Sequence, residues 1–310
     1  GAGYMIGKIK SSKWHHLDVW NRLSSQFYQK ITENQDLILR LSLIFWYIFY
    51  CLKNRINPWL FFQLNIDYYN EKKGLFSKLE LDALIPDKWR LKQYRDEGEI
   101  KPEKFPVFHK PEWGQNAYGI RRFDNISDFE NRHLNMRQTK TSYLVQEAAP
   151  GKKEFEVFYI RDTENDDKFS VLTITLVSNQ QKITNPISSV RNSNTQYHNI
   201  TQQIPIQRQQ GIWNHFNQIG HFKIARVGLR ADSINDILTG NFKIFEINLF
   251  TPMPINLLDD KETLNRKMLF IKKTMSALAN ITKLVIVHQK YQPVFFNKLI
   301  KHYRLKLWKY

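Results

Sequence analysis

Residues 222–248 read FKIARVGLRADSINDILTGNFKIFEIN, and each end of this stretch is rich in β-branched and aromatic residues. Such segments, bounded by polar turn residues, are typical of β-strands. We predict that Phe222–Arg230 and Phe242–Asn248 form a pair of strands. Because residues two apart in a strand point to the same face, Glu246 and Asn248 would share one face of this pair.

The first strand of the pair places basic side chains beside that carboxylate and amide. Arg226, Gly228 and Arg230 share a face by the same rule. Carboxylate and amide oxygens suit Mg2+, and arginines suit the charge on a transferring phosphoryl group or a tetrahedral oxyanion. The alternative that stays open is a cross-strand ion pair between Glu246 and an arginine, with Asn248 starting a turn.

Upstream of this pair, the chain alternates between further strands and polar connections. A short helix is predicted at Ser77–Leu84, ending before Pro86. The other predicted strands are Phe105–Lys110, Tyr143–Glu147, Glu154–Arg161 and Phe169–Val177, the last two forming a hairpin. Residues 178–211 are rich in Asn, Gln, Ser and Thr, which predicts a mobile loop without a core element.

Polar groups lie at the ends of two of these strands. Lys110 precedes a loop bounded by Gly114 and Gly119, and its ammonium and the loop N–H groups could hold phosphates together. The Gln-Glu pair at 146–147 ends the next strand, where free polar groups could read an adenine edge, and Glu154 could bind ribose hydroxyls. Taken singly, these features are also typical of an ordinary turn and an exposed hairpin.

Taken in order, these elements resemble the ATP-grasp superfamily, and within it the D-alanine–D-alanine ligase-like branch of carboxylate–amine ligases. The resemblance covers about residues 76–256, and its most specific part is FEIN at 245–248, downstream of Arg226. It implies an α+β fold in which two lobes grip ATP, with a helical N-terminal segment and a helical C-terminus. It also implies an ATP-dependent ligase that activates a carboxylate as an acyl phosphate for attack by an amine, with ATP and Mg2+ as cofactors.

The resemblance also assigns roles to single residues. Arg226 and Arg230 would be catalytic, Arg226 by steadying the acyl phosphate or the tetrahedral intermediate, and Glu246 and Asn248 would bind Mg2+. The implied ATP-binding residues are Lys78, Lys110, Gly114, Gln115, Asn116, Gly119, Gln146, Glu147 and Glu154. In this set the lysines contact phosphates, the glycine-bounded loop closes over them, the Gln-Glu pair forms the adenine hinge and the last glutamate binds ribose. Residues 178–211 would contribute to a lid that excludes water from the acyl phosphate.

The chain departs from the family pattern in two places. The family has an acidic metal ligand at the position of Gly228, and Asp232 lies about 13 Å farther along an extended strand. The metal would then be held more weakly or be completed by a substrate group, or catalysis would be lost. The residues before the ATP-grasp-like part read as helical rather than α/β, so we expect unusual acceptor specificity.

The expected domain organisation has four parts. They are a helical region at 1–75 (with 1–4 as an expression scar), a small ATP-grasp lobe at 76–142, a large lobe at 143–260 that includes the mobile loop, and C-terminal helices with a basic tail at 261–310.

The composition is basic and poor in cysteine. A formal net charge of +17 over 310 residues suits polyanions: nucleotide phosphates, nucleic acid or anionic lipid. Cys51 is the only cysteine, which excludes an internal disulfide and a cysteine-based metal site and favours a cytoplasmic protein. The nine histidines show no metal-ligand spacing, and no nucleic-acid-binding motif is recognisable.

Residues 37–52 read LILRLSLIFWYIFYCL, which is short for a membrane span of about 20 residues. The flanking Arg40, Lys53 and Arg55 suit a helix that lies in a membrane interface, and a buried helix is the other interpretation. Two functional alternatives stay open: an ATP-grasp kinase of a polyanionic substrate, and a catalytically impaired basic protein on a membrane or nucleic acid. The expected partners are a small-molecule or peptide carboxylate, an amine acceptor and a second copy in a homodimer, with peripheral association at the inner face of an anionic membrane as a further expectation.

Overall fold

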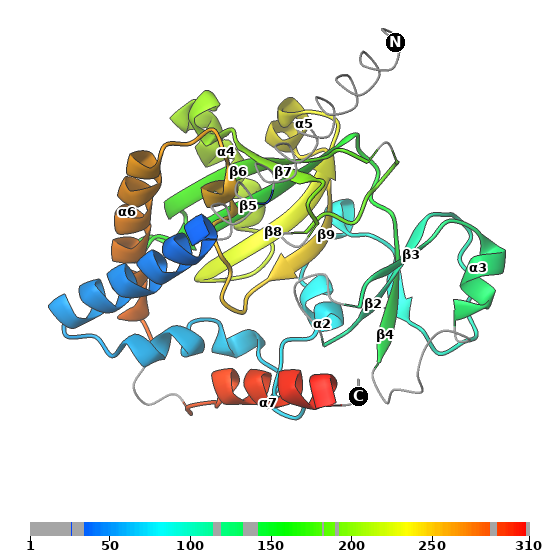
Figure 1. The fold of residues 1–310 in the computed structure, drawn as a ribbon, viewed down its shortest axis with the longest axis horizontal. Coiled ribbons are helices and arrows are strands. Elements are labelled where there is room, and N and C mark those ends of the chain that lie inside the picture. Colours follow the sequence, from blue (N-terminus) through cyan, green and yellow to red (C-terminus); the bar gives the residue numbers. More distant parts are fainter. Residues whose placement is uncertain are drawn as a thin grey trace, which may run out of the picture.

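The computed structural model of this chain contains two antiparallel β-sheets surrounded by helices (Figure 1). It describes residues 26, 34–113, 119–132, 142–181, 183–189, 192–285 and 290–307. The predicted α+β class is confirmed. The predicted expression scar and the first part of the predicted N-terminal helical region lie outside the described residues.

The smaller sheet has the strand order β1-β4-β2-β3, and its described pairs are antiparallel. Its strands are β1 (Gln93–Arg95), β4 (Tyr143–Glu147), β2 (Val107–Pro111) and β3 (Arg121–Phe123). Helix α3 (Ile126–Glu130) covers one face, where Val107, Val145 and Phe129 form a small core. Helix α2 (Lys78–Asp82) lies between this sheet and the larger one (Figure 1). We call this sheet with α2 and α3 the small lobe.

The larger sheet has the order β7-β6-β5-β8-β9 and is also antiparallel. Its strands are β7 (Thr195–Asn199), β6 (Phe169–Asn179), β5 (Lys153–Arg161), β8 (Ile224–Ala231) and β9 (Lys243–Asn248). Strand β9 forms the edge of the sheet that faces the small lobe (Figure 1). This sheet and the helices packed on it form the large lobe.

One face of the large sheet is buried by two helices. Phe155, Val157 and Tyr159 alternate along β5, so all three point to this face. They belong to the main hydrophobic core together with side chains of α4 (Ile206–Phe216) and α5 (Ile234–Thr239).

The opposite face of the large sheet is apolar at one end only. Phe158 and Ile160 pack there against α6 (Leu264–Thr282) and the N-terminal helix Asn34–Lys53 in a second core. Toward the start of β5, the same face carries glutamates instead. This switch along one strand places polar side chains on the face of the sheet that also carries Glu246 and Asn248 of β9.

The remaining described elements connect and cover the lobes. They are the 3-10 helices η1 (Pro58–Gln63), η2 (Ile66–Tyr68), η3 (Asp87–Trp89), η5 (Thr201–Gln203) and η6 (Ile255–Leu258), and helix α7 (Val294–Leu307). Trp59 and Phe62 of η1 contact Phe295 of α7, with ring centroids 5.5 and 5.1 Å apart. In Figure 1, α7 runs along the bottom of the view, beside the segment that contains η1.

Most of the predicted strands are observed close to their expected bounds. The hairpin is β5 and β6, and the predicted helix at Ser77–Leu84 is α2, with Ser77 as its N-cap. Strand β4, however, is hydrogen-bonded between β1 and β2 of the small sheet. The boundary predicted at residue 143 therefore falls one strand too early, and the chain leaves the small lobe after Glu147.

The prediction that residues 178–211 form a mobile loop is wrong for its second half. Strand β7 and the start of α4 lie within it, and the side chain of Tyr197 is buried. Its polar composition concealed these elements because an edge strand needs few apolar side chains. The apolar residues that anchor α4, which are Ile212, Trp213 and Phe216, lie just beyond the polar stretch.

Replacing Trp213 by alanine should lower the free energy of unfolding by about 3–5 kcal/mol, because it leaves a large cavity in the main core. Trp213 is fully buried, and its ring centroid lies 5.0 Å from that of Tyr159. Urea denaturation measures the change. Ile206→Ala, at the exposed start of the same helix, is the matched control and should stay within about 0.5 kcal/mol of the parent. A loss below about 1 kcal/mol for Trp213→Ala would contradict the placement of α4 in the core.

Candidate functional site

A cavity lies where the small sheet, α2 and the edge strand β9 meet; it spans about 280 Å³ when the space open to solvent is included. It is lined by Lys78, Leu81, Asp82, Ile85, Gln93, Lys110, Gln146, Phe245, Glu246 and Ile247. The two lysines belong to the small lobe and the glutamate to the large lobe. Residues more than a hundred positions apart in the sequence thus meet between the lobes, with both signs of charge.

Lys110 is buried in the wall of this cavity at the end of β2. Its Nζ donates to Oε1 of Gln146 and to the carbonyl oxygen of Phe245, each at 3.1 Å. Burial lowers the pKa of Lys110 to about 8, although Glu246 and Asp82 nearby act in the opposite direction. An ammonium that has lost its hydration in this way is stabilised when an anion enters.

Lys78 is the second cation of the cavity and the first residue of α2. Its Nζ donates to the carbonyl oxygen of Pro111 at 2.7 Å. Burial first, and repulsion from Lys110 second, lower its pKa to about 7. Two lysines that repel each other in one cavity suit a polyanion that can contact both.

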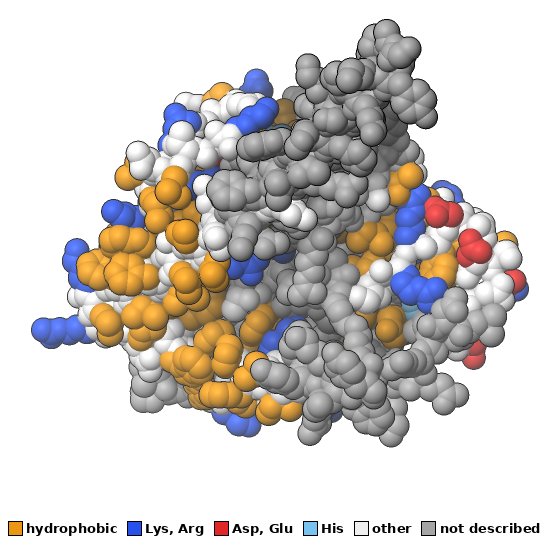
Figure 2. Space-filling view, viewed as in Figure 1, with side chains coloured by type: hydrophobic (Ala, Val, Ile, Leu, Met, Phe, Trp, Pro, Cys, Tyr) orange, Lys and Arg blue, Asp and Glu red, His pale blue; other side chains and the backbone are white. Residues whose placement is uncertain are grey.

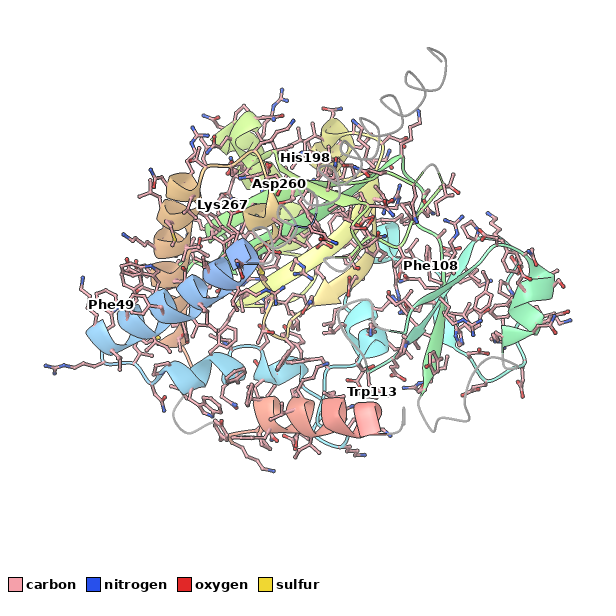
Figure 3. The ribbon with its side chains drawn as sticks, viewed as in Figure 1. Phe49, Phe108, Trp113, His198, Asp260 and Lys267 are labelled. Carbon is pink, nitrogen blue, oxygen red and sulfur yellow. The ribbon has the colours of Figure 1, made fainter. Side chains whose placement is uncertain are left out.

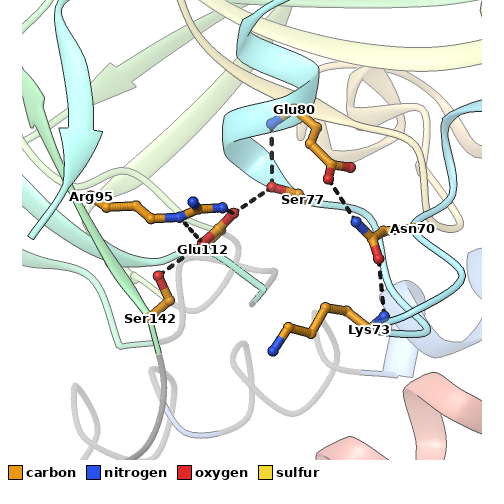
Figure 4. A network of polar contacts seen from close by, with 7 residues as sticks. All are labelled: Asn70, Lys73, Ser77, Glu80, Arg95, Glu112 and Ser142. Carbon is orange, nitrogen blue, oxygen red and sulfur yellow. Dashed lines mark hydrogen bonds and ion pairs between the residues drawn. The ribbon is translucent and has the colours of Figure 1, made fainter.

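A polar network fixes the first turn of α2 to the small sheet (Figure 4). The buried carboxylate of Glu112 accepts from Ser77 Oγ at 2.7 Å, from Ser142 Oγ at 2.8 Å and from Arg95 at 3.0 Å. Burial would raise the pKa of Glu112, but hydrogen bonds from these three side chains outweigh it and lower the pKa. The backbone N–H of Lys78 also donates to the carbonyl of Glu112 at 3.1 Å. The network therefore holds the first lysine of the cavity in position.

A row of facing residues crosses three strands of the large sheet. Glu156 of β5 pairs with Gly228 of β8, which pairs with Glu246 of β9. Paired residues of antiparallel strands share a face, so two carboxylates flank a glycine. In the next row Arg226 pairs with Asn248, and the Nε of Arg226 lies 3.4 Å from Glu156 Oε2. The predicted shared face of Arg226, Glu246 and Asn248 is therefore present.

Burial and mutual repulsion disfavour the charged forms of the carboxyl groups on this face. Burial raises the pKa of Glu156 to about 7; Arg226 opposes this shift and Glu246 adds to it. Burial raises the pKa of Glu154 to about 8, with repulsion from Glu156 adding to it and Arg230, 3.5 Å away, acting against it. Carboxyl groups in this state are stabilised as anions by a nearby cation.

Asn248 offers an oxygen to such a cation. It is 6% exposed, and its Oδ1 has no hydrogen-bond partner among the described residues. A buried acceptor without a partner, next to carboxylates, fits a hard divalent ion. No group of three or more His, Cys, Asp and Glu side chains in the described part of the chain is arranged to hold a metal. The residues therefore fit Mg2+ that takes some of its ligands from bound phosphates, as this ion usually does.

The ATP-grasp pattern has an acidic residue at the position of Gly228. Such a side chain would not fit here unless neighbouring side chains moved. A Cβ at Gly228 would lie 2.8 Å from the ring of Phe245 and 3.3 Å from Glu156 Oε1. Asp232 does not substitute for that acid, because its Oδ1 accepts from the backbone N–H of Lys152 at 2.9 Å. Glu156 on the neighbouring strand places a carboxylate directly beside Gly228.

The sequence analysis did not identify Glu156, although a signal for it exists. In the strand EFEVFYIR at 154–161, Glu154 and Glu156 are two residues apart and share a face. The strand is otherwise mostly apolar and buried. Two acidic side chains on one face of such a strand are unfavourable unless they are paired with cations, so their presence indicates arginines or a metal ion opposite them.

The other residues with predicted roles are more scattered. Gln146 lines the cavity, whereas Glu147 accepts from the backbone N–H of Lys92 at 2.8 Å. Arg230 donates to the carbonyl of Gly151 at 3.1 Å, in addition to its ion pair with a glutamate of β5. Gly119 has φ +74°, a left-handed conformation that favours glycine. Gly114, Gln115 and Asn116 lie outside the described residues.

Comparisons with known proteins return similarity in structure alone. No protein-family model and no curated protein matches this sequence. D-alanine–D-alanine ligase from Bacillus anthracis in complex with ATP is 13% identical, with a TM-score of 0.44 over 67% of this chain and 67% of that one. An L-amino acid ligase from Bacillus licheniformis is 15% identical, with a TM-score of 0.42 over 65% of this chain and 47% of that one.

A third similar structure is the ATP-grasp ligase PsnB in complex with a minimal precursor. It is 14% identical, with a TM-score of 0.38 over 65% of this chain and 60% of that one. This chain thus spans about half to two-thirds of the length of these proteins. All three are ligases.

Proposed function

We propose that this chain is an ATP-dependent carboxylate–amine ligase that binds ATP with Mg2+ between its two lobes. It activates a carboxylate as an acyl phosphate, which an amine then attacks. The observation that carries this proposal is the cavity at which Lys78 and Lys110 of the small lobe meet Glu246 of the large lobe. The sequence identity to known ligases is low. The proposal therefore rests on the contacts that these residues make.

The two lysines bind the phosphates of ATP. Both ammonium groups are partly desolvated, with pKa values lowered to about 7 for Lys78 and about 8 for Lys110. A phosphate chain between them supplies the negative charge that restores their protonated forms. Gln93 lines the same cavity, and its buried Oε1 has no hydrogen-bond partner among the described residues. This oxygen is suited to accept from the exocyclic amino group of adenine.

The face of the large sheet supplies the oxygen ligands for Mg2+. Glu246, Asn248 and Glu156 lie in two adjacent rows of that face. The ion offsets the charge of the phosphates and of the transferring phosphoryl group when it is bound. Arg226 lies beside these ligands and donates to the carbonyl of Met253 at 3.2 Å. In this proposal its guanidinium stabilises the oxyanion formed when the amine attacks.

Hydroxylamine trapping tests the reaction class. Hydroxylamine attacks an acyl phosphate, so ATP, Mg2+ and a panel of amino-acid and peptide carboxylates should yield a hydroxamate together with ADP. ADP formation that depends on an alcohol, with a phosphorylated product and no hydroxamate, would show a kinase instead. ATP turnover that is absent with every carboxylate and every alcohol, with no ATP binding, would contradict both reactions.

Binding of an ATP analogue near pH 8.5 is expected to take up protons. Above its folded pKa of about 7 or about 8, each lysine is mostly neutral, and phosphates raise that pKa, so binding protonates it. Below about pH 6 both lysines are already charged, and the uptake should vanish. Calorimetric titrations in buffers of different ionisation enthalpy measure the number of protons.

Two variants check the source of these protons. Lys110→Met should reduce the uptake, whereas Lys92→Met is the matched control, since the Lys92 side chain is 57% exposed and lies outside the cavity. The titrations omit Mg2+, because its binding would itself release protons from Glu154 and Glu156. Under these conditions, proton release near pH 8.5, or an uptake that does not change between pH 6 and 8.5, would contradict the assigned role of the lysines.

A further inference from the structure

The N-terminal helix Asn34–Lys53 presents a long apolar stripe to the outside of the molecule. Large apolar side chains that are between 40% and 65% exposed recur along it. Examples are Leu37, Leu41, Ile44, Phe45, Ile48 and Leu52. Their spacing of mostly three or four residues places them on one side of the helix. Exposed apolar patches of this kind mark a contact with another molecule or a membrane.

The opposite side of the same helix is fixed to the protein. Leu39 and Cys51 are buried in the core shared with α6. Tyr47 Oη lies 3.0 Å from Thr282 Oγ1 and donates to the carbonyl of Pro58 at 3.3 Å. The helix is long and apolar enough to cross a membrane by length and composition, with a mean hydropathy of 1.4. Because it is packed along α6, it lies on the surface of the molecule rather than projecting from it.

The apolar surface continues onto neighbouring elements. Trp59 of η1 is 39% exposed and Phe296 of α7 is 50% exposed, with their ring centroids 5.8 Å apart. Leu299 and Ile300, one turn farther along α7, are also exposed. Figure 2 shows this apolar area as one broad surface over the N-terminal helix, η1 and α7. Phe49, labelled in Figure 3, marks its outer end. We call this area the apolar face.

Basic side chains border the apolar face. In Figure 2 Lys and Arg side chains lie around it and also over the small lobe, whereas the acidic side chains in view gather over the small lobe alone. Arg40, Lys53 and Arg55 are exposed on or just after the N-terminal helix. The Nζ of Lys272 lies 4.6 Å from the centroid of the Trp46 ring, at the seam between this helix and α6.

We propose that the apolar face docks the protein onto the surface of an anionic lipid bilayer. The apolar side chains enter the boundary between headgroups and acyl chains, and the bordering cations contact lipid phosphates. A second copy of the chain could also cover apolar side chains, but it would bring two basic borders together. Anionic lipid satisfies both the apolar and the basic part of the surface, and a net charge of +17 adds to the attraction.

Cosedimentation of the full chain with lipid vesicles tests this docking, and it needs no nucleotide. Phosphatidylcholine vesicles that contain phosphatidylglycerol should bind at least about tenfold more tightly than vesicles of phosphatidylcholine alone. Added salt should weaken the binding, because it screens the cationic border. Ile44→Glu combined with Ile48→Glu should reduce binding by about tenfold or more, because it removes apolar contact and adds negative charge.

A matched variant and a second measurement complete the test. Ile206→Glu makes one such substitution at a position that is 61% exposed on α4, and it should leave vesicle binding unchanged. In the unsubstituted protein, brominated acyl chains should quench part of the tryptophan fluorescence, since Trp59 lies on the apolar face. The proposal is overturned if anionic vesicles do not bind, if the double variant binds as the parent does, or if bromine does not quench. A concentration-dependent dimer that the double variant abolishes, in a protein that ignores vesicles, would show a self-association surface instead.

Discussion

Replacing Lys110 by methionine is expected to reduce ATP-dependent ADP formation by about a thousandfold or more, because it removes a cation that contacts the phosphates. The protein should not lose stability. Methionine fills a similar volume, and the native ammonium is buried with a pKa lowered to about 8, so its charge is already unfavourable. Loss of activity at unchanged or higher stability would identify a functional role for this side chain.

The measurement combines ADP release with thermal denaturation of the same preparations. Lys243→Met is the matched control, since Lys243 also lies on a strand, is partly buried and bonds a backbone carbonyl, that of Arg90 at 3.4 Å. It does not line the cavity and should retain activity. If Lys110→Met kept more than about a tenth of the activity, the phosphate role would be wrong.

Replacing Glu246 by glutamine is expected to weaken Mn2+ binding in the nucleotide complex by about a hundredfold, and Glu156→Gln by about tenfold or more. Each change removes one anionic oxygen from the face that also holds the unpartnered Oδ1 of Asn248. Electron paramagnetic resonance reports free Mn2+ directly, so the result does not depend on turnover. ADP formation should fall in parallel.

Glu154→Gln is the control for these two variants. Glu154 lies on the same strand and face as Glu156 and is also buried beside an arginine. It should retain Mn2+ affinity and weaken the binding of the nucleotide. Unchanged Mn2+ affinity in Glu156→Gln would mean that Glu156 does not replace the acidic ligand that is missing at Gly228. Unchanged affinity in Glu246→Gln would refute the metal site itself.

The strands of the large sheet were predictable because their side chains alternate and their turns are polar. The hairpin of β5 and β6 and the strand pair of β8 and β9 are found close to the bounds that this pattern gives. Strands β1 and β3 were missed, since each has only three residues and shows no period. Strand β7 was missed because its composition is polar. It is an edge strand and pairs with β6 alone.

The candidate site was predictable where one strand contains the relevant side chains. Glu246 and Asn248 share a face by simple alternation, and Lys110 ends a recognisable strand. Glu156 was missed because its position opposite Gly228 depends on the register of β5 against β8, which no local pattern contains. The approach of Lys78 to Lys110 likewise depends on hydrogen bonds that join α2 to residues far along the chain.

The sequence left two interpretations of residues 37–52, a buried helix and an interfacial one. Both sides of this helix are apolar, so a hydrophobic pattern could not choose between them. In the folded chain Leu39, Tyr47 and Cys51 face the core, while Phe45 and Leu52 are 60% and 65% exposed. One side of the helix is thus buried, and the exposed side is the one that the docking proposal assigns to a membrane surface.

The most direct test of the account is a crystal structure of this chain with a non-hydrolysable ATP analogue and Mg2+. We expect the phosphates within hydrogen-bond distance of Lys110 Nζ and Lys78 Nζ, and the ion in contact with Glu246 and Asn248. Adenine should lie on the small-lobe side of the same cavity, near Gln93. A nucleotide bound elsewhere, or one whose phosphates contact neither lysine, would contradict the central claim.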